Sequence, residues 1–141
     1  MNANELSCNP HVDAFVVKDL NVDPVLPFED NSFDIVTNAV SIDYLTQPVA
    51  VCREIARVLK PGGAALFSLS NRCFPSKAVD IWLRSSDLQH VYIVGAYFHY
   101  SAMFHPPSAS EISPNQSASQ WRGGSSMNEA YLAVVRAQVM K

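Results

Sequence analysis

The stretch "EIARVLKPGGAALFSLSN", Glu54–Asn71, decides the fold. It begins with apolar residues at helical spacing, breaks at Pro61-Gly62-Gly63, and continues as an apolar run that ends in small polar residues. Apolar residues that recur every three or four positions predict a helix, and a short apolar run after glycine predicts a buried strand. The sequence therefore predicts a helix that returns directly into a strand.

Upstream, this helix is expected to begin at Pro48 and to cover residues 48–60. Proline suits the first turn because its missing N–H would have no intrahelical partner there. Four residues form one apolar stripe at helical spacing: Val51, Ile55, Val58 and Leu59. The glycines that follow can adopt the left-handed backbone that ends a helix. We interpret Arg57 and Lys60 as a solvated face in the last turn, where cations favour the helix dipole.

Two further apolar runs predict strands before this helix, at 14–17 ("AFVV") and at 33–40 ("FDIVTNAV"). A polar loop separates them, and the connection "SIDYLTQP" allows one helical turn. Strands that alternate with helices indicate an α/β fold with a mostly parallel sheet and flanking helices.

After Asn71 the pattern changes. The segment 76–104 predicts two helices, with Ser76 and either Ser86 or Asp87 as caps. Residues 105–129 are rich in Ser, Pro, Asn and Gly and predict a polar loop with a short strand near 111–113. Residues 130–141 fit a final strand or a short helix, and their β-branched residues favour the strand. The whole chain, 1–141, is interpreted as a single domain.

Composition excludes several classes of protein. The chain of 141 residues is 48% hydrophobic, with a net charge of −3 and a pI near 5.7, so nucleic acid is not indicated as a partner. No apolar stretch is long enough to predict a membrane span. The cysteines at 8, 52 and 73 form no CxxC pair and no metal spacing with the histidines, so we expect no metal site. They indicate a reducing compartment, cytoplasm or an organelle such as the chloroplast if a transit peptide lies upstream.

Three places are candidates for a ligand site, because ligands of open parallel sheets bind beyond the carboxyl ends of the strands. The first predicted strand is followed by "KDLN", the second ends in "TNAVS" and the third ends in "SLSNR". Polar residues therefore follow each apolar run at the edge where a crevice is expected. Ser70 and Asn71 are expected to border this crevice, although a surface-loop role fits Asn71 and Arg72 as well.

Three motifs in this order resemble the class I S-adenosylmethionine-dependent methyltransferases of the type 11 group. They are Asp19 followed by "LPF" at 26–28, "DNSFDIV" at 30–36, and "RVLKPGG" at 57–63. The resemblance covers about residues 14–72. The segments "SNRCF" and "YFHY" are similar to those of a plant subgroup and extend the likeness to about Pro114.

The resemblance implies a cofactor, S-adenosyl-L-methionine, and names the residues that would hold it. Asp19 would accept a hydrogen bond from the adenine amino group, and the backbone N–H of Leu20 would donate a hydrogen bond to the adenine ring. Asn38 and Ala39 would line the methionine part. The alternatives are structural: Asp19 as the cap of a turn, and Asn38 as a partner for backbone groups at a strand end. No catalytic residue is assigned; His90, His99 and His105 are candidate bases by residue type alone.

One part of the family's pattern is absent, namely the glycine-rich cofactor loop after the first strand. The resemblance therefore implies that the chain starts too late and lacks the first two strands of a partial Rossmann-like fold. An apolar sheet edge would then be exposed, which predicts self-association.

The leading hypothesis is methyl transfer to an unknown, small-molecule or other, acceptor. The alternative is a non-catalytic methyltransferase-like fragment that acts, if at all, as a binding or partner-dependent protein. A Rossmann-type oxidoreductase is disfavoured, because neither GxGxxG nor Tyr-x-x-x-Lys occurs.

Overall fold

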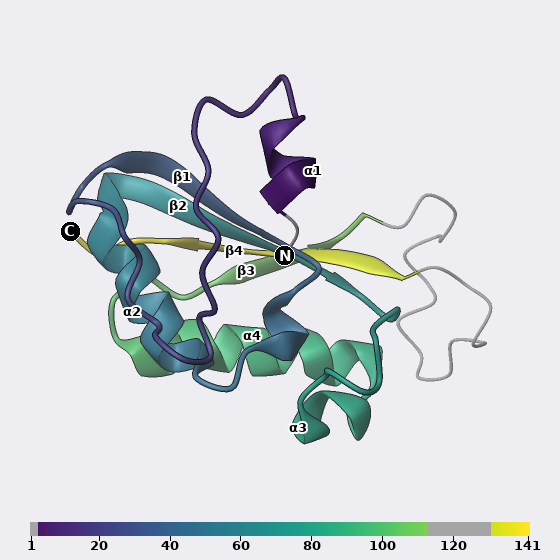
Figure 1. The fold of residues 1–141 in the computed structure, drawn as a ribbon. Helices are drawn as coiled ribbons and strands as arrows, with labels where there is room; N and C mark the ends of the chain where they lie inside the picture. The colour runs from purple at the N-terminus through teal and green to yellow at the C-terminus, as the bar shows by residue number, and fades with distance from the viewer. Residues whose placement is uncertain (1–2, 113–130) are drawn as a thin grey trace.

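The computed structural model of the chain describes residues 3–112 and 131–141. In chain order the elements are α1 (Ala3–Ser7), β1 (Phe33–Ala39), the 3₁₀ helix η1 (Ile42–Tyr44), α2 (Pro48–Val58), β2 (Leu59–Ser70), α3 (Asp80–Leu83), α4 (Asp87–Ser101), β3 (Ser108–Glu111) and β4 (Leu132–Gln138). The strands form one sheet in the order β1-β2-β4-β3, and Figure 1 shows α2 and α4 on the same side of it. The α/β fold predicted from the sequence is confirmed.

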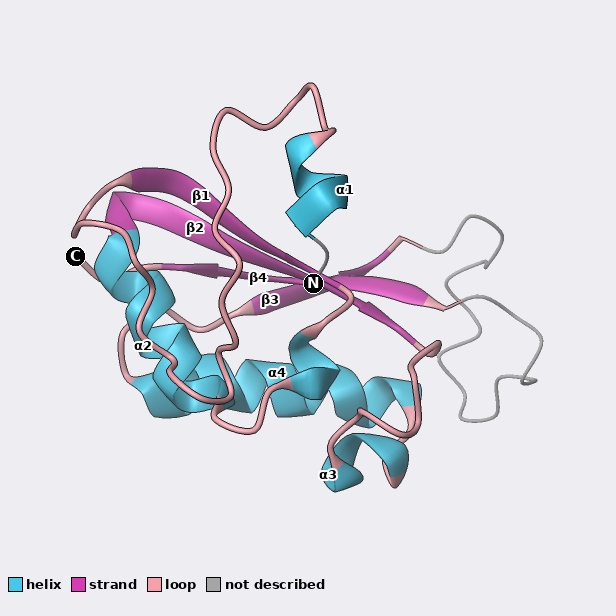
Figure 2. Ribbon diagram, viewed as in Figure 1, coloured by secondary structure: helices cyan, strands magenta, loops and turns pink. Residues whose placement is uncertain are grey.

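The sheet is more antiparallel than the sequence predicted. Among the described strands, β1 pairs with β2 in parallel, whereas β4 pairs antiparallel with both β2 and β3. Figure 2 shows the strands together with the connections between them. The chain leaves β1 at its carboxyl end, and α2 carries it back so that β2 runs in the same direction. A helical crossover is the usual way to join two parallel strands.

The core lies between the sheet and the helices α2 and α4. The side chains of Ala65, Phe67 and Leu69 on β2 face this side, and each is at most 1% exposed. Register places Val135 of β4 opposite Phe67, and Val135 is equally buried. On β1 the alternate residue Ile35 faces the other way and is 58% exposed, because no helix covers that position. One face of the sheet therefore carries the packing.

The stretch that decided the fold behaves as expected, except for its glycines. The helix α2 ends at Val58 with an extended residue, Leu59, as its C-cap, so the glycines do not end it. Gly62 instead adopts a left-handed backbone (φ 77°) within β2, where the register with β1 shifts. A Cβ on Gly63 would lie 2.9 Å from the carbonyl oxygen of Lys60, so the chain needs glycine there for close approach.

The predicted strand at 14–17 is wrong. These residues have no regular structure, and Phe15, Val16 and Val17 are between 43% and 49% exposed. A strand needs a neighbour to satisfy its backbone groups, and no strand of the described chain pairs with this segment. Apolar composition alone does not produce a strand without such a partner.

The segment after Asn71 contains the two predicted helices. Ser86 caps α4 in a capping box with Gln89, as one of the two suggested caps. Ser76 is not a cap, because α3 begins later and has Val79 at its N-cap position. The short predicted strand is β3, which lies slightly earlier than expected. Most of the polar loop at 105–129 lies outside the described residues.

Candidate functional site

Asp19 and Leu20 lie in a turn of the long loop before β1. The Oδ1 atom of Asp19 accepts a hydrogen bond from the N–H of Asn21 at 2.9 Å, and its carbonyl oxygen accepts from the N–H groups of Val22 and Asp23. The structural interpretation of Asp19 therefore holds for one carboxylate oxygen. Within the described residues, Oδ2 of Asp19 and the N–H of Leu20 have no hydrogen-bond partner. One acceptor and one donor on consecutive residues thus have no partner among the described residues.

Asn21 fastens this turn to the segment that follows β1. Its Nδ2 donates to the carbonyl oxygen of Tyr44 at 2.9 Å, and its Oδ1 accepts from the N–H of Thr46 at 2.8 Å. The side chain of Gln47 donates to the carbonyl oxygen of Asn21 at 3.2 Å. Leu20 itself packs against the hydrophobic core. The Asp19 turn is therefore held in place by contacts far away in sequence.

Asn38 and Ala39 lie at the carboxyl end of β1, as predicted. The Oδ1 atom of Asn38 accepts hydrogen bonds from the N–H and the hydroxyl of Ser41, at 3.4 and 3.2 Å. Its Nδ2 donates to no other described residue, and Ala39 is exposed. Val40 next to it has a φ of 43°, a left-handed backbone that β-branched residues rarely adopt. Its N–H donates to the carbonyl oxygen of Ser68 on β2 at 3.1 Å, which holds the bend.

The structure brings the two predicted groups to the same end of the sheet. Ser41, which bonds to Asn38, directly precedes η1, and Tyr44, which bonds to Asn21, is its last residue. At the polar end of β2, the side chains of Ser70 and Asn71 accept hydrogen bonds from backbone N–H groups. The hydroxyl of Ser70 accepts from the N–H of Arg72, and Oδ1 of Asn71 accepts from the N–H of Tyr131.

A buried polar cluster near this end was missed by the sequence reasoning. Asp43 is only 4% exposed, and burial raises the pKa of its carboxyl above the ordinary value, an effect that Tyr44 and His90 partly offset. The hydroxyl of Tyr44 accepts from the N–H of Phe74 at 3.1 Å. The only sequence signal is an acidic residue just after the second apolar run, which is common on surfaces as well.

The three candidate histidines are not brought together. His90 is buried, stacks on the ring of Trp82 at 3.9 Å between centroids, and bonds through Nε2 to the carbonyl oxygen of Trp82. His99 is exposed on α4, and His105 is exposed in the loop after it. Among the described residues, no hydrogen bond or ring contact links any of the three to Asp19 or Asn38, so none is assigned as a base.

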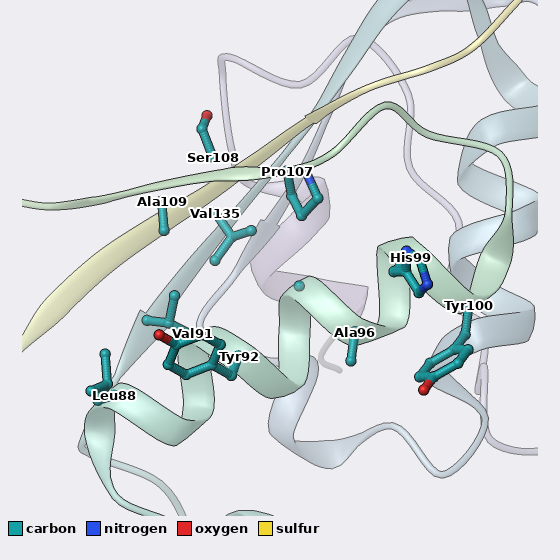
Figure 3. Close-up of a pocket in the computed structure, with 11 residues that line it drawn as sticks. Leu88, Val91, Tyr92, Ala96, His99, Tyr100, Pro107, Ser108, Ala109 and Val135 are labelled. Carbon is teal, nitrogen blue, oxygen red and sulfur yellow. The ribbon is translucent and has the colours of Figure 1, made fainter.

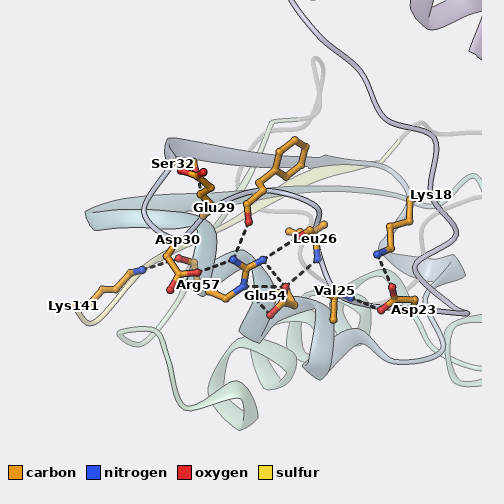
Figure 4. A network of polar contacts seen from close by, with 11 residues as sticks. Lys18, Asp23, Val25, Leu26, Glu29, Asp30, Ser32, Glu54, Arg57 and Lys141 are labelled. Atoms are coloured by element: carbon orange, nitrogen blue, oxygen red, sulfur yellow. Dashed lines mark hydrogen bonds and ion pairs between the residues drawn. The ribbon is translucent and has the colours of Figure 1, made fainter.

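Arg57 corrects the prediction of a merely solvated face. Figure 4 shows its guanidinium between two carboxylates, with Nη2 at 2.8 Å from Glu54 and Nη1 at 2.7 Å from Asp30. The same group donates to the carbonyl oxygens of Leu26 and Phe28. The Arg57 guanidinium lowers the pKa of the Glu54 carboxyl, which also accepts from the N–H of Leu26.

We call these five residues, Leu26, Phe28, Asp30, Glu54 and Arg57, the Arg57 network. It ties the loop that carries two of the sequence motifs to the third motif on α2. Lys141 extends it by donating to the carbonyl oxygen of Arg57 and to the side chain of Asn31. Nζ of Lys60 lies 2.9 Å from Oδ2 of Asp34. Because both side chains are well exposed, this ion pair adds little to the stability of the fold. The motifs therefore carry side chains that hold the loop before β1 against α2.

Two further properties concern only the described residues. No group of three or more histidine, cysteine, aspartate or glutamate side chains lies close enough there to hold a metal ion. In the same part of the chain, no helix has the length and apolar character needed to cross a membrane. All three cysteines are free thiols, and burial raises the pKa of Cys52 to about 12.

Comparison with known protein families places residues 2–67 in a match to the methyltransferase domain family. This range includes the Asp19 turn, the end of β1 and the Arg57 network.

Curated relatives share part of the chain. It is 29% identical over 87 residues to a malonyl-[acyl-carrier protein] O-methyltransferase of Marinomonas sp., covering 62% of this chain and 31% of that protein. It is 43% identical over 60 residues to the ubiquinone/menaquinone biosynthesis C-methyltransferase UbiE of Hahella chejuensis, covering 40% of this chain and 24% of that protein. The match thus spans about a quarter to a third of these relatives.

Solved structures share the fold at low sequence identity. A SAM-dependent methyltransferase from Aquifex aeolicus matches with a TM-score of 0.56 and 16% identity, over 89% of this chain and 54% of that one. The [4+2]-cyclase SpnF matches with the same TM-score and 17% identity, over 82% of this chain and 53% of that one. Since these structures include both a methyltransferase and a cyclase, the likeness establishes the α/β fold and leaves the reaction open.

Proposed function

We propose that this chain, whose residues 2–67 match the methyltransferase domain family, supplies part of the cofactor site of an S-adenosyl-L-methionine-dependent methyltransferase. The observation that carries the proposal is the pair of open groups in the Asp19 turn, inside the matched range. Adenine presents an amino donor and a ring acceptor on one edge, and Oδ2 of Asp19 beside the N–H of Leu20 offers the complementary acceptor and donor.

The end of β1 would hold the other part of the cofactor. Ala39 is exposed and small, which leaves room beside the strand end, and Nδ2 of Asn38 stays free to donate to a carboxylate. The strained backbone at Val40 supports a role for this place, because such strain gathers at functional sites. The sequence resemblance pointed to the same two residues.

Bound S-adenosyl-L-methionine would supply an activated methyl group. The task of this chain is then to bind and orient, since in-line positioning lowers the barrier by fixing the reacting atoms in place. Asp19 and Leu20 would fix the adenine end, while Asn38 and Ala39 would fix the amino-acid end. The Arg57 network would keep the turn in register with β1. We assign no base.

Binding of S-adenosylhomocysteine, followed by isothermal titration calorimetry, tests this proposal. Asp19→Asn keeps an oxygen for the Asn21 N–H but replaces the other oxygen with a donor, which would face the adenine amino group. We expect binding to weaken by about tenfold or more, as for loss of a charged hydrogen bond. The matched control is Asp23→Asn in the same loop, where the carboxylate bonds to Lys18 and to the N–H of Val25.

If Asp19→Asn and Asp23→Asn bound S-adenosylhomocysteine equally well, Asp19 would not be part of the cofactor site. No heat with the unmodified chain at millimolar ligand would favour the alternative, a methyltransferase-like protein that binds no cofactor by itself. The methyl acceptor is proposed to be a small molecule. The "SNRCF" and "YFHY" segments still favour a plant subgroup, although the two curated relatives described above are bacterial.

Self-association is a separate proposal about the same chain. Among the described strands, β1 pairs only with β2, so its other edge carries unpaired backbone groups next to the exposed Ile35. Light scattering during gel filtration would measure the mass. A monomer at all concentrations up to the millimolar range would contradict the proposal.

A further inference from the structure

A pocket of about 480 Å³ lies between α4 and the β3–β4 side of the sheet, away from the Asp19 turn. In Figure 3 the side chains of α4 line one side, and Pro107, Ala109 and Val135 line the other. A volume of a few hundred Å³ is typical of sites for small organic molecules. All of its lining residues lie outside the 2–67 match, so the cofactor proposal does not account for it.

The lining is apolar and aromatic. Leu88, Val91 and Ala96 contribute aliphatic surface from α4, and Tyr92 and Tyr100 stand at the rim, 70% and 68% exposed. Large aromatic side chains on the solvent side of a helix leave apolar surface in water unless something covers them. The pocket and these rings form one continuous apolar surface.

The pocket has few polar groups. No lysine, arginine, aspartate or glutamate is among the lining residues; the polar members are Tyr92, Tyr100, His99 and Ser108. A charged ligand would lose its hydration here without gaining an opposite charge. A neutral ligand would lose little and could bond to a hydroxyl or to the imidazole.

Gly95 opens the pocket from the side of the helix. A Cβ there would meet Pro107 Cγ at 3.7 Å, an ordinary contact, so a methyl group fits but a longer side chain would enter the pocket. Gly95 has no positive φ that would require glycine, and glycine within a helix costs about 1 kcal/mol relative to alanine. Glycine at position 95 thus keeps the pocket open and makes α4 less stable than alanine would.

From this geometry we propose that the pocket binds a neutral, ring-containing organic molecule that bears a hydroxyl or carbonyl group. The ring stacks against Tyr92 or Tyr100, and the polar group bonds to His99 or Ser108. The apolar body lies on Val91 and Val135. This proposal does not depend on cofactor binding.

The test uses N-phenyl-1-naphthylamine, a neutral amine with a naphthyl and a phenyl group whose fluorescence rises in apolar sites, titrated into the full chain. We expect saturable binding that Gly95→Leu weakens by more than about tenfold, because the side chain fills the pocket. Ala14→Leu adds three carbons at an exposed position outside the pocket lining, and it should bind as the unmodified chain does.

A second pair keeps the test decisive if Gly95→Leu fails to fold. His99→Asp places a carboxylate at the pocket and should weaken the neutral probe by about fivefold to tenfold. His105→Asp makes the same change at an exposed position outside the lining and should leave binding unchanged. No saturable binding by the unmodified chain, or equal binding by both aspartate variants, would overturn the proposal. The cofactor measurements use S-adenosylhomocysteine and residues outside this pocket lining, so failure here leaves the cofactor proposal intact.

Discussion

Two apolar runs of similar character end up in opposite environments. "AFVV" at 14–17 is irregular and about half exposed, whereas "AALFSLS" at 64–70 is the buried part of β2. The second run has β1 on one side, β4 on the other and helices on one face, whereas no strand of residues 3–112 and 131–141 pairs with the first. The difference teaches that apolar composition creates a tendency, while backbone partners decide whether a strand forms.

The largest expected effect is on the free energy of unfolding, and it differs between the two runs. Phe67 is fully buried and its ring centroid lies 4.7 Å from that of Phe98, so Phe67→Ala should lower the free energy of unfolding by about 3–5 kcal/mol. Phe15 is 43% exposed, so Phe15→Ala should change it by about 0.5 kcal/mol or less. Urea denaturation followed by circular dichroism measures both. A large cost for Phe15→Ala would mean that the first run is buried in solution, for instance against a second chain.

The sequence predicted β1, α2 and β2 well, and it predicted the segment before β1 poorly. β1, α2 and β2 follow from local signals: the apolar stripe from Val51, the Pro48 start and the run from Ala64. The segment 14–17 carried the same kind of signal, but whether it pairs depends on strands that no local pattern describes. Glu54 lies three residues before Arg57 on α2, but the other partners of Arg57, Asp30 and the carbonyl oxygens of Leu26 and Phe28, lie in the loop before β1 and were equally invisible. The Asp19 turn is fastened to the segment after β1 by Asn21, whose role no motif indicated.

The next largest effect on stability concerns the contact between the loop before β1 and α2. Arg57→Met keeps a long apolar stem but removes the bonds to Glu54, Asp30 and two carbonyl oxygens. We expect a loss of about 2 kcal/mol, because hydrogen bonds to charged groups contribute that much even when partly exposed. Hydrogen exchange should show the N–H of Leu26 losing protection while β2 keeps its own. Arg57→Lys is the control: it restores the charge without the planar fork and should recover part of the loss.

A smaller effect is the pH dependence of the same contact. The pKa of Glu54 is lower in the folded chain, chiefly through Arg57, than the value near 4.3 expected when unfolded. Its contribution is therefore fully present above about pH 4.3 and is lost as the pH falls through the folded pKa. Glu54→Gln should flatten this acid limb in urea titrations.

Asp43 works in the opposite direction and must be separated from Glu54. Burial raises its pKa in the folded chain, so its ionisation costs stability as the pH rises through that pKa, and protonation at lower pH relieves the cost. Asp43→Asn should remove this opposing trend and make the acid loss due to Glu54 steeper. An acid limb that is unchanged in Glu54→Gln would show that the Arg57 network is not formed in solution.

The smallest effect compares two residues with a left-handed backbone, Val40 just after β1 and Gly62 within β2. For most residues a left-handed backbone costs about 1–2 kcal/mol, and asparagine tolerates it better than a β-branched residue. Val40→Asn should therefore raise the free energy of unfolding by up to about 1 kcal/mol, since the side chain is 43% exposed and loses little packing. Gly62→Ala should lower it by about 1 kcal/mol, although a Cβ there meets nothing within 4 Å, because the cost lies in the backbone alone. If both changes were neutral, neither backbone would be held left-handed in solution. If Val40→Asn stabilised the chain but weakened S-adenosylhomocysteine, the strain at the end of β1 would belong to the cofactor site and not only to the turn.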